Sequence, residues 1–274
     1  MSISNTNKAN PREILLEELA DNGVLRLTLN DAKRRNALSE EMMTKLATAL
    51  TSASENEDIR TIIIAGNGPA FCSGHDLKQM SARRKKDEDG RAYFSKVFSS
   101  CSELMQMIVN HPKPIIAEIS GVAAAAGCQL VACCDLAVAG ESARFITPGV
   151  NIGLFCSTPM VALSRNLSNK AAMEMLLTGE MVDSSKAERI GLINRVVEDK
   201  NVAQQTEELA NLIASKSSMV LETGKKAFYN QKDMPLSEAY EYASKVMVEN
   251  MLKNDAREGI NAFVEKRHPK WQDK

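Results

Sequence analysis

Two segments rich in small residues lie where chemistry could occur. The first, NGPAFCSGHDLKQM at 67–80, follows an apolar run at 60–66, and the second, SGVAAAAGCQL at 120–130, follows an apolar run at 114–119. If the runs are strands of a parallel sheet, both segments leave it at the carboxyl ends of strands, where ligands bind in such folds. Small side chains let a ligand approach the backbone, and a helix that begins there points free N–H groups outward. One N–H group from each segment could polarise a carbonyl oxygen. The alternative is that these residues only allow tight packing of strand against helix.

The first segment also contains the residue types of a catalytic triad, in Ser73, His75 and Asp76. Neighbours in one loop rarely place a nucleophile, a base and an orienting carboxylate in line, and the chain has no G-x-S-x-G motif. We therefore do not expect these three side chains to form a triad.

Cys156 is a further candidate nucleophile, since a nearby helix N-terminus would lower the pKa of its thiol. The alternative, which we favour, is a small buried thiol followed by Ser157 or Thr158 as the helix N-cap.

Strand-like and helix-like patterns alternate in the first half of the chain. A turn signal at 21–23 separates two strand-like runs, and Ser39 is a good N-cap for the helical pattern that follows. Repeated strand–helix–strand units imply parallel pairing through right-handed crossovers, and therefore an α/β fold. The predicted strands are 13–19, 24–29, 60–66, 114–121 and 135–140, and the predicted helices of this half are 39–53 and 91–110.

After about residue 157 the pattern becomes mostly helical, with one strand-like run at 192–197. We divide the chain into a disordered lead at 1–12, an α/β core at 13–200 and a helical C-terminal region at 201–274.

Composition excludes several classes of protein. The net charge of −1 gives no basic surface for nucleic acid or anionic membranes. Six cysteines without a CxxC pair and only three histidines make a zinc site improbable, and mostly apolar flanks suit buried, reduced thiols. No apolar run is long enough to span a membrane and the first residues lack a secretory signal, so we expect a cytoplasmic protein, or a mitochondrial one in a eukaryote.

Several motifs together resemble the enoyl-CoA hydratase/isomerase (crotonase) superfamily. They are RRNALSEEM, GNGPAFCSGHDLKQM, ISGVAAAAGCQLVACCDLAVAGESARFITPGVNIGL, LTGEMVDSSKAERIGLINRVV and EGINAFVEKRHPKW, in the order and spacing of that family. The motifs AAAAGCQL and TPGVNIGLFCSTP are most similar to one branch of this superfamily. The resemblance implies a fold of repeated ββα units closed by helices that pack into trimers or hexamers. It also implies an acyl-CoA ligand, with coenzyme A as part of the substrate and no separate cofactor or metal.

The resemblance assigns the oxyanion hole to the backbone N–H groups of His75 and Ala126. Hydratases of the family carry two glutamates, at the positions that Gln129 and Gly149 occupy here. Neither an amide nor a glycine can shuttle a proton near neutral pH, and positioned acid–base groups contribute roughly 10²–10⁴-fold each. We therefore expect weak or absent hydratase activity. Two hypotheses stay open, a crotonase-type lyase or isomerase with another proton relay and a non-catalytic acyl-CoA binder.

The resemblance also suggests residues that hold coenzyme A. Basic residues suit its phosphates. For each basic residue of the run DAKRR, an exposed, solvated side chain without a ligand is an equally good interpretation. Asp135 is interpreted as structural, and Glu118 could face the site or pair with a cation. The suggested coenzyme A contacts are Lys33, Arg34, Arg35, the backbone of Cys72, Gly74, Asp76 and Leu77, and Phe263 and Lys266 reaching a neighbouring subunit's ligand.

Overall fold

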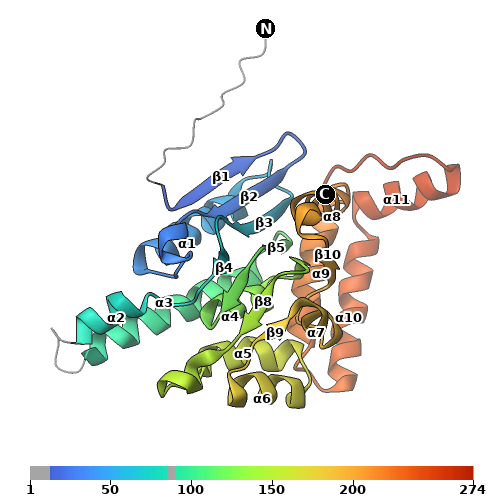
Figure 1. Cartoon of the computed structure of the whole chain (residues 1–274). Helices are drawn as coiled ribbons and strands as arrows, with labels where there is room; N and C mark the ends of the chain where they lie inside the picture. The colour runs from blue at the N-terminus through green and yellow to red at the C-terminus, as the bar shows by residue number, and fades with distance from the viewer. Residues whose placement is uncertain (1–12, 85–89, 274) are drawn as a thin grey trace, which may run out of the picture.

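The computed structural model describes residues 13–84 and 90–273, so the predicted lead at 1–12 lies outside the described residues. Two sheets form the α/β body, and a group of helices at the C-terminal end stands beside it (Figure 1). Within the described ranges, no helix combines the length and the apolar character needed to cross a membrane. The α/β class and the helical C-terminal region predicted from the sequence are confirmed.

The larger sheet has the strand order β1-β2-β3-β5-β7-β10. Its first two strands pair antiparallel as the predicted hairpin, and all the other pairs are parallel, as the alternating pattern predicted. The smaller sheet has the order β4-β6-β8-β9, with β9 antiparallel to β8. The strands are β1 Leu15–Leu19, β2 Val24–Leu29, β3 Thr61–Gly66, β4 Ala70–Cys72, β5 Ile115–Ile119, β6 Val122–Ala124, β7 Leu136–Gly140, β8 Arg144–Ile146, β9 Val182–Asp183 and β10 Arg195–Val197.

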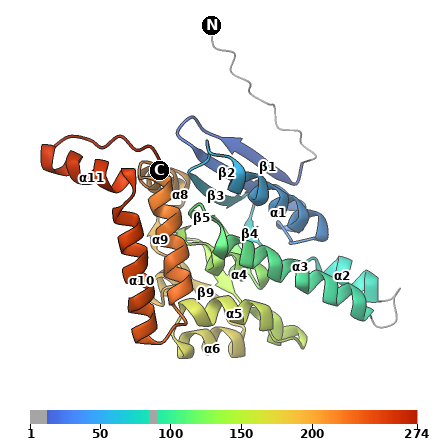
Figure 2. The same cartoon turned by 180° about the vertical axis from the view of Figure 1, so that it is seen from behind.

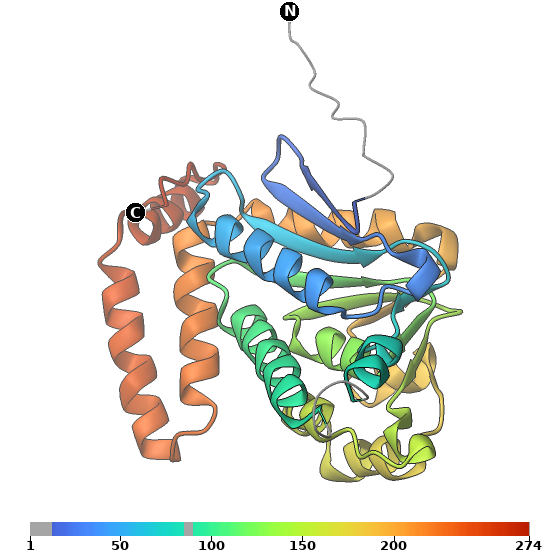
Figure 3. The same cartoon turned by 90° about the vertical axis from the view of Figure 1, so that its left-hand side faces the viewer.

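Helices cover both faces of the larger sheet, which explains why β3 is apolar from Ile62 to Ala65. Ile62 and Ile64 pack into the main core with α1 and α3, whereas Ile63 packs on the other face against Leu209 of α8. Figure 3 shows α1 in front of this sheet and α8 behind it. The helices are α1 Glu40–Glu55, α2 Leu77–Arg84, α3 Arg91–Asn110, α4 Ala126–Cys133, α5 Ser157–Asn166, α6 Asn169–Thr178, α7 Ser184–Arg189, α8 Val202–Ala214, α9 Ser218–Gln231, α10 Leu236–Met251 and α11 Asn254–Glu265.

The C-terminal helices are attached through a partly buried ion pair. Lys225 of α9 donates to the Asp135 carboxylate over 2.7 Å, and the Tyr229 hydroxyl donates to the same carboxylate over 3.1 Å. Asp135 also accepts the backbone N–H of Ile115 at the start of β5. These contacts give Asp135 the structural role expected from its place before β7. Figure 2 shows α9 and α10 side by side and α11 extending away from the sheets.

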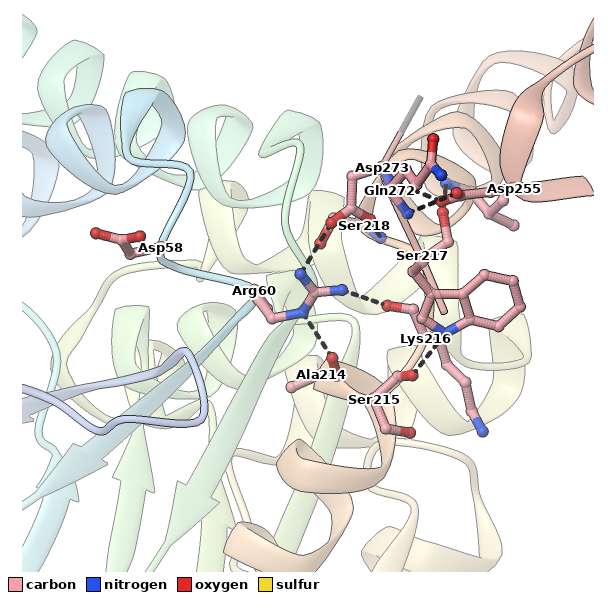
Figure 4. Close-up of polar contacts among 12 residues, drawn as sticks. Asp58, Arg60, Ala214, Ser215, Lys216, Ser217, Ser218, Asp255, Gln272 and Asp273 are labelled. Atoms are coloured by element: carbon pink, nitrogen blue, oxygen red, sulfur yellow. Dashed lines mark hydrogen bonds and ion pairs between the residues drawn. The ribbon is translucent and has the colours of Figure 1, made fainter. Parts of the chain in front are cut away.

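The chain end returns to the body of the molecule and is held there by Arg60, which precedes β3 (Figure 4). The Arg60 guanidinium donates to the carbonyl oxygens of Ala214 and Lys216, both over 2.7 Å, and pairs with Asp273 over 2.9 Å. Asp255 of α11 is 1% exposed and accepts the backbone N–H of Asp273 over 2.9 Å. The tail therefore fixes α11 relative to the junction between α8 and α9.

Candidate active site

The two small-residue segments meet because β4 and β6 are neighbours in the smaller sheet. Glycine is required where they touch. A Cβ on Gly127 would lie 2.1 Å from the Cys72 carbonyl oxygen, and a Cβ on Gly74 would lie 2.9 Å from the Ala124 carbonyl oxygen. Gly74 also has φ +87°, a conformation that favours glycine. The small residues therefore allow tight packing, which was the alternative role considered from the sequence. This packing also brings the backbones of the two segments into contact.

Two backbone N–H groups at this junction are free to bind a ligand. His75 and Ala126 line the same cavity, and neither N–H donates a hydrogen bond to an acceptor in 13–84 or 90–273. Ala126 is the first residue of α4, whose opening N–H groups have no partner within the helix. Ala125 before it has φ +49°, a costly conformation for a residue with a Cβ, and such strain is concentrated at functional sites.

The cavity has a volume of about 500 Å³ and a mainly apolar wall. Its large apolar side chains come from α2, α3 and the segment between β8 and α5. Of these residues, only Leu77 was assigned to the site from the sequence. For residues 152–155 the available signal was an apolar run without strand or helix periodicity. The large apolar side chains are Leu77, Met80, Phe98, Ile152, Leu154 and Phe155.

Only one of the two glutamate positions faces this cavity. Gly149 lines it, whereas Gln129 lines a second cavity of about 390 Å³ between α3, α4 and α5. Gln129 is 4% exposed, and its side-chain oxygen has no hydrogen-bond partner in the described part of the chain. The assignment of Gln129 and Gly149 to one catalytic site therefore stays a prediction, with Gly149 at the first cavity and Gln129 at the second.

The His75 ring packs edge-on against Phe98, with the ring centroids 5.4 Å apart. Both ring nitrogens are buried without a hydrogen-bond partner among the described residues. Burial lowers the pKa of His75, and the backbone of Leu38 opposes part of that shift. The ring is therefore neutral at pH 7.

The triad suggested by composition is not assembled. The Asp76 carboxylate accepts the backbone N–H groups of Lys78 and Gln79 at the start of α2, and the Ser73 hydroxyl donates to the carbonyl oxygen of Arg34. None of these contacts involves the His75 ring, so the three residues do not form a relay.

Cys156 lines the cavity and is itself the residue before α5, so the prediction of Ser157 or Thr158 as N-cap was wrong. Ser157 and Thr158 lie in the first turn of that helix. Burial raises the pKa of the Cys156 thiol, and a hydrogen bond with the backbone of Gly149 opposes part of that shift. The thiolate needed for nucleophilic attack is therefore disfavoured, which supports the interpretation of Cys156 as a small buried residue.

Glu118 does not face the cavity. Its carboxylate pairs with the Arg26 guanidinium over 2.8 Å, so of the two roles considered from the sequence it has the one of a partner for a cation.

The basic loop at 33–35 lies beside the first segment. The backbone N–H of Ser73 donates to the Arg35 carbonyl oxygen over 3.0 Å, and Arg34 pairs with Asp31 over 2.6 Å and with Asp76 over 3.5 Å. The side chains of Lys33 and Arg35 are exposed. The structure thus brings these candidate phosphate ligands to the edge of the site.

Phe263 lies in α11 and Lys266 directly follows that helix, which stands away from α2 and α3 in Figure 1. Within one chain neither residue joins the cavity.

Comparison with known proteins agrees with this architecture. A family profile described as enoyl-CoA hydratase/isomerase matches residues 20–274. The protein named enoyl-CoA hydratase domain-containing protein 3, mitochondrial, from Rattus norvegicus is 47% identical over 249 residues, which are 91% of this chain and 81% of that relative. Its human counterpart is 44% identical over 96% of this chain and 85% of the relative.

Solved structures show the same fold. The crystal structure of an enoyl-CoA hydratase from Mycobacterium smegmatis has a TM-score of 0.90 at 46% identity, covering 94% of this chain and 99% of that chain. The crystal structure of human enoyl-CoA hydratase domain-containing protein 3 also has a TM-score of 0.90, at 44% identity, covering 94% of this chain and 100% of that chain. The predicted crotonase-type fold and the predicted branch are confirmed, and the chain belongs to the enoyl-CoA hydratase/isomerase family.

Proposed function

We propose that the protein binds an acyl-CoA thioester, whose carbonyl oxygen accepts hydrogen bonds from the backbone N–H groups of His75 and Ala126. The observation that carries this proposal is the presence of both free N–H groups in one apolar cavity. Donors held in place by the backbone would stabilise negative charge on that oxygen without reorganising. The exposed Lys33 and Arg35 at the edge of the site suit the phosphates of coenzyme A.

A matched pair of ligands tests the role of the carbonyl oxygen. Hexanoyl-CoA and its thioether analogue S-hexyl-CoA differ in that oxygen, while the alkyl chain and coenzyme A stay the same. Two hydrogen bonds at about 1 kcal/mol each predict roughly tenfold to thirtyfold tighter binding of the thioester. Titration calorimetry measures both dissociation constants. Equal affinities would refute the proposed oxyanion hole.

The proposed catalytic activity is a weak crotonase-type reaction. No carboxylate lines the described cavity, so hydration of a short trans-2-enoyl-CoA should be slower than in a two-glutamate enzyme by on the order of 10³-fold or more. The other candidate is a non-catalytic acyl-CoA binder, favoured by the raised pKa of the Cys156 thiol, which disfavours a nucleophilic thiolate. Turnover of enoyl-, hydroxyacyl- and malonyl-type CoA esters, measured beside binding, distinguishes the two. Hydration at the rate of a two-glutamate enzyme would contradict both.

We also propose that the chain assembles into trimers or hexamers. Its C-terminal helices expose large apolar side chains that water disfavours, including Phe263 at 85% exposure and Leu236 at 75%. A second copy would cover them, and it would place Phe263 and Lys266 where the resemblance puts them, at a neighbour's coenzyme A. Light scattering that returns a 30.0 kDa particle would contradict this assembly.

The cytoplasmic location stays a prediction. The names of the rat and human relatives include the word mitochondrial, which supports the mitochondrial alternative for a eukaryotic source.

A further inference from the structure

The second cavity adjoins the proposed acyl site. Thr158 of α5 lines both cavities, so its side chain lies between them. Ala126 and Gln129, about one turn apart on α4, line the first and the second cavity respectively. An acyl group in the first cavity therefore has a second space of about 390 Å³ on the other side of Thr158.

The wall of the second cavity contains a polar group that the protein leaves unsatisfied. Gln129 is buried to 96%, being 4% exposed, and its side-chain oxygen has no hydrogen-bond partner in the described ranges. Leaving a buried polar group unpaired costs about 1–3 kcal/mol, so such a group calls for an explanation. A half-turn of the amide exchanges its oxygen and nitrogen with little change of shape, so it can offer an acceptor or two donors to a ligand.

A cation lines the same cavity. The guanidinium of Arg165, an exposed residue, donates to the carbonyl oxygen of Val161 over 3.2 Å. Thr158 and Asn110 also line this space, while Met105 and Ala162 supply apolar surface. A guanidinium, an amide and a hydroxyl around an apolar base suit a short alkyl segment that ends in a carboxylate.

We propose that the second cavity holds the far end of the acyl group and that this end carries a carboxylate. The inference rests on the proposed function and deepens it, because it assigns the ligand class as a dicarboxylic mono-CoA thioester. The thioester carbonyl oxygen binds at His75 and Ala126, and the terminal carboxylate accepts hydrogen bonds from Arg165, Gln129 and Thr158. A plain alkyl end would instead bury the Gln129 amide against apolar carbon and leave it unpaired.

Matched acyl-CoA esters test the proposal by titration calorimetry. Succinyl-, glutaryl- and adipyl-CoA are compared with butyryl-, pentanoyl- and hexanoyl-CoA, which have the same chain lengths and end in methyl groups. At the length that reaches the second cavity, the carboxylated ester should bind about tenfold tighter than its partner, because hydrogen bonds to charged groups are stronger than neutral ones.

Two variants locate the effect. Arg165→Gln should abolish the preference for the carboxylated ester while leaving the affinity for its methyl-ended partner within about twofold. Arg189→Gln removes the same charge from an exposed position that lines neither cavity, and it should keep the preference. Gln129→Leu should reduce the preference and should not weaken binding of the methyl-ended ester.

The outcomes separate this inference from the proposed function. If the methyl-ended esters bind but no carboxylated ester is preferred, or if the preference survives Arg165→Gln, the inference is wrong and the acyl-CoA site stands. If none of the six esters binds, the proposed function and this inference fall together.

Discussion

Replacing Gly149 with alanine tests whether the cavity wall is built without a side chain at this position. A Cβ on residue 149 would lie 2.9 Å from the Cys156 sulfur, 2.9 Å from the Leu154 carbonyl oxygen and 3.3 Å from the Cys156 backbone nitrogen. Real Cβ atoms essentially never approach other heavy atoms closer than 3.0 Å, so the segment between β8 and α5 must move. Overpacking of this kind costs about 1–3 kcal/mol. We expect Gly149→Ala to lower the free energy of unfolding by that amount.

Urea unfolding measures the change, with two variants as controls. Gly224→Ala makes the same substitution in the middle of α9, where a Cβ would meet no atom within 4 Å, and should stabilise the protein by about 0.5–1 kcal/mol. Cys156→Ala removes the sulfur, so Gly149→Ala should cost less in that background, and the difference gives the coupling energy between the two side chains. Gly149→Ala with wild-type stability, or with the same cost in both backgrounds, would refute the reasoning.

The same crowding bears on the missing glutamates. From the sequence, Gln129→Glu combined with Gly149→Glu should restore measurable hydration, with either change alone restoring less. Since a side chain on residue 149 meets Cys156, we expect the pair to restore more activity when Cys156→Ala is added. Hydration of a short trans-2-enoyl-CoA, followed spectrophotometrically, measures each variant. Identical rates with and without Cys156→Ala would show that crowding does not limit the restoration.

Three further predictions concern stability and reactivity. Burial lowers the pKa of His111 and of His75, so below about pH 6.5 the unfolded chain binds more protons than the native protein and stability falls as pH falls. His111→Gln should therefore weaken the drop in melting temperature between pH 7.5 and 5.5, and an unchanged drop would contradict this. All six cysteines are buried, and burial raises the pKa of each, to about 12 in Cys72, so native protein at pH 8 should resist Ellman's reagent until it is denatured. Rapid native labelling of several thiols would overturn that expectation. Lys225→Met leaves the Asp135 carboxylate partly buried without its ion pair and should cost about 3 kcal/mol in urea unfolding, whereas a loss under 1 kcal/mol would mean that solvent replaces the lysine.

Much of the fold follows from the sequence because its signals are local. Ser39 caps α1 by accepting the Met42 backbone N–H, as its residue type predicted, and the helix predicted at 91–110 begins and ends at those residues. The apolar run in β3 predicted a strand buried on both faces, which α8 on one side and α1 and α3 on the other provide. The neighbouring position of the two small-residue segments was also predictable, since each follows a strand, β3 or β5, and these two strands pair in parallel.

The tertiary structure alone decided where individual side chains point. Gln129 could be placed on α4 from the sequence, but its exposure to the second cavity depends on how α3 and α5 pack around that helix. Glu118 meets Arg26 because β2 and β5 flank β3, which brings together residues 92 positions apart. The φ of +49° at Ala125 arises where β6 passes into α4 against the Cys72 strand. Backbone elements are determined by interactions over a few residues, so the sequence by itself determined them. Side-chain direction and strain depend on contacts between distant segments, and these exist only once the sheets and helices have packed.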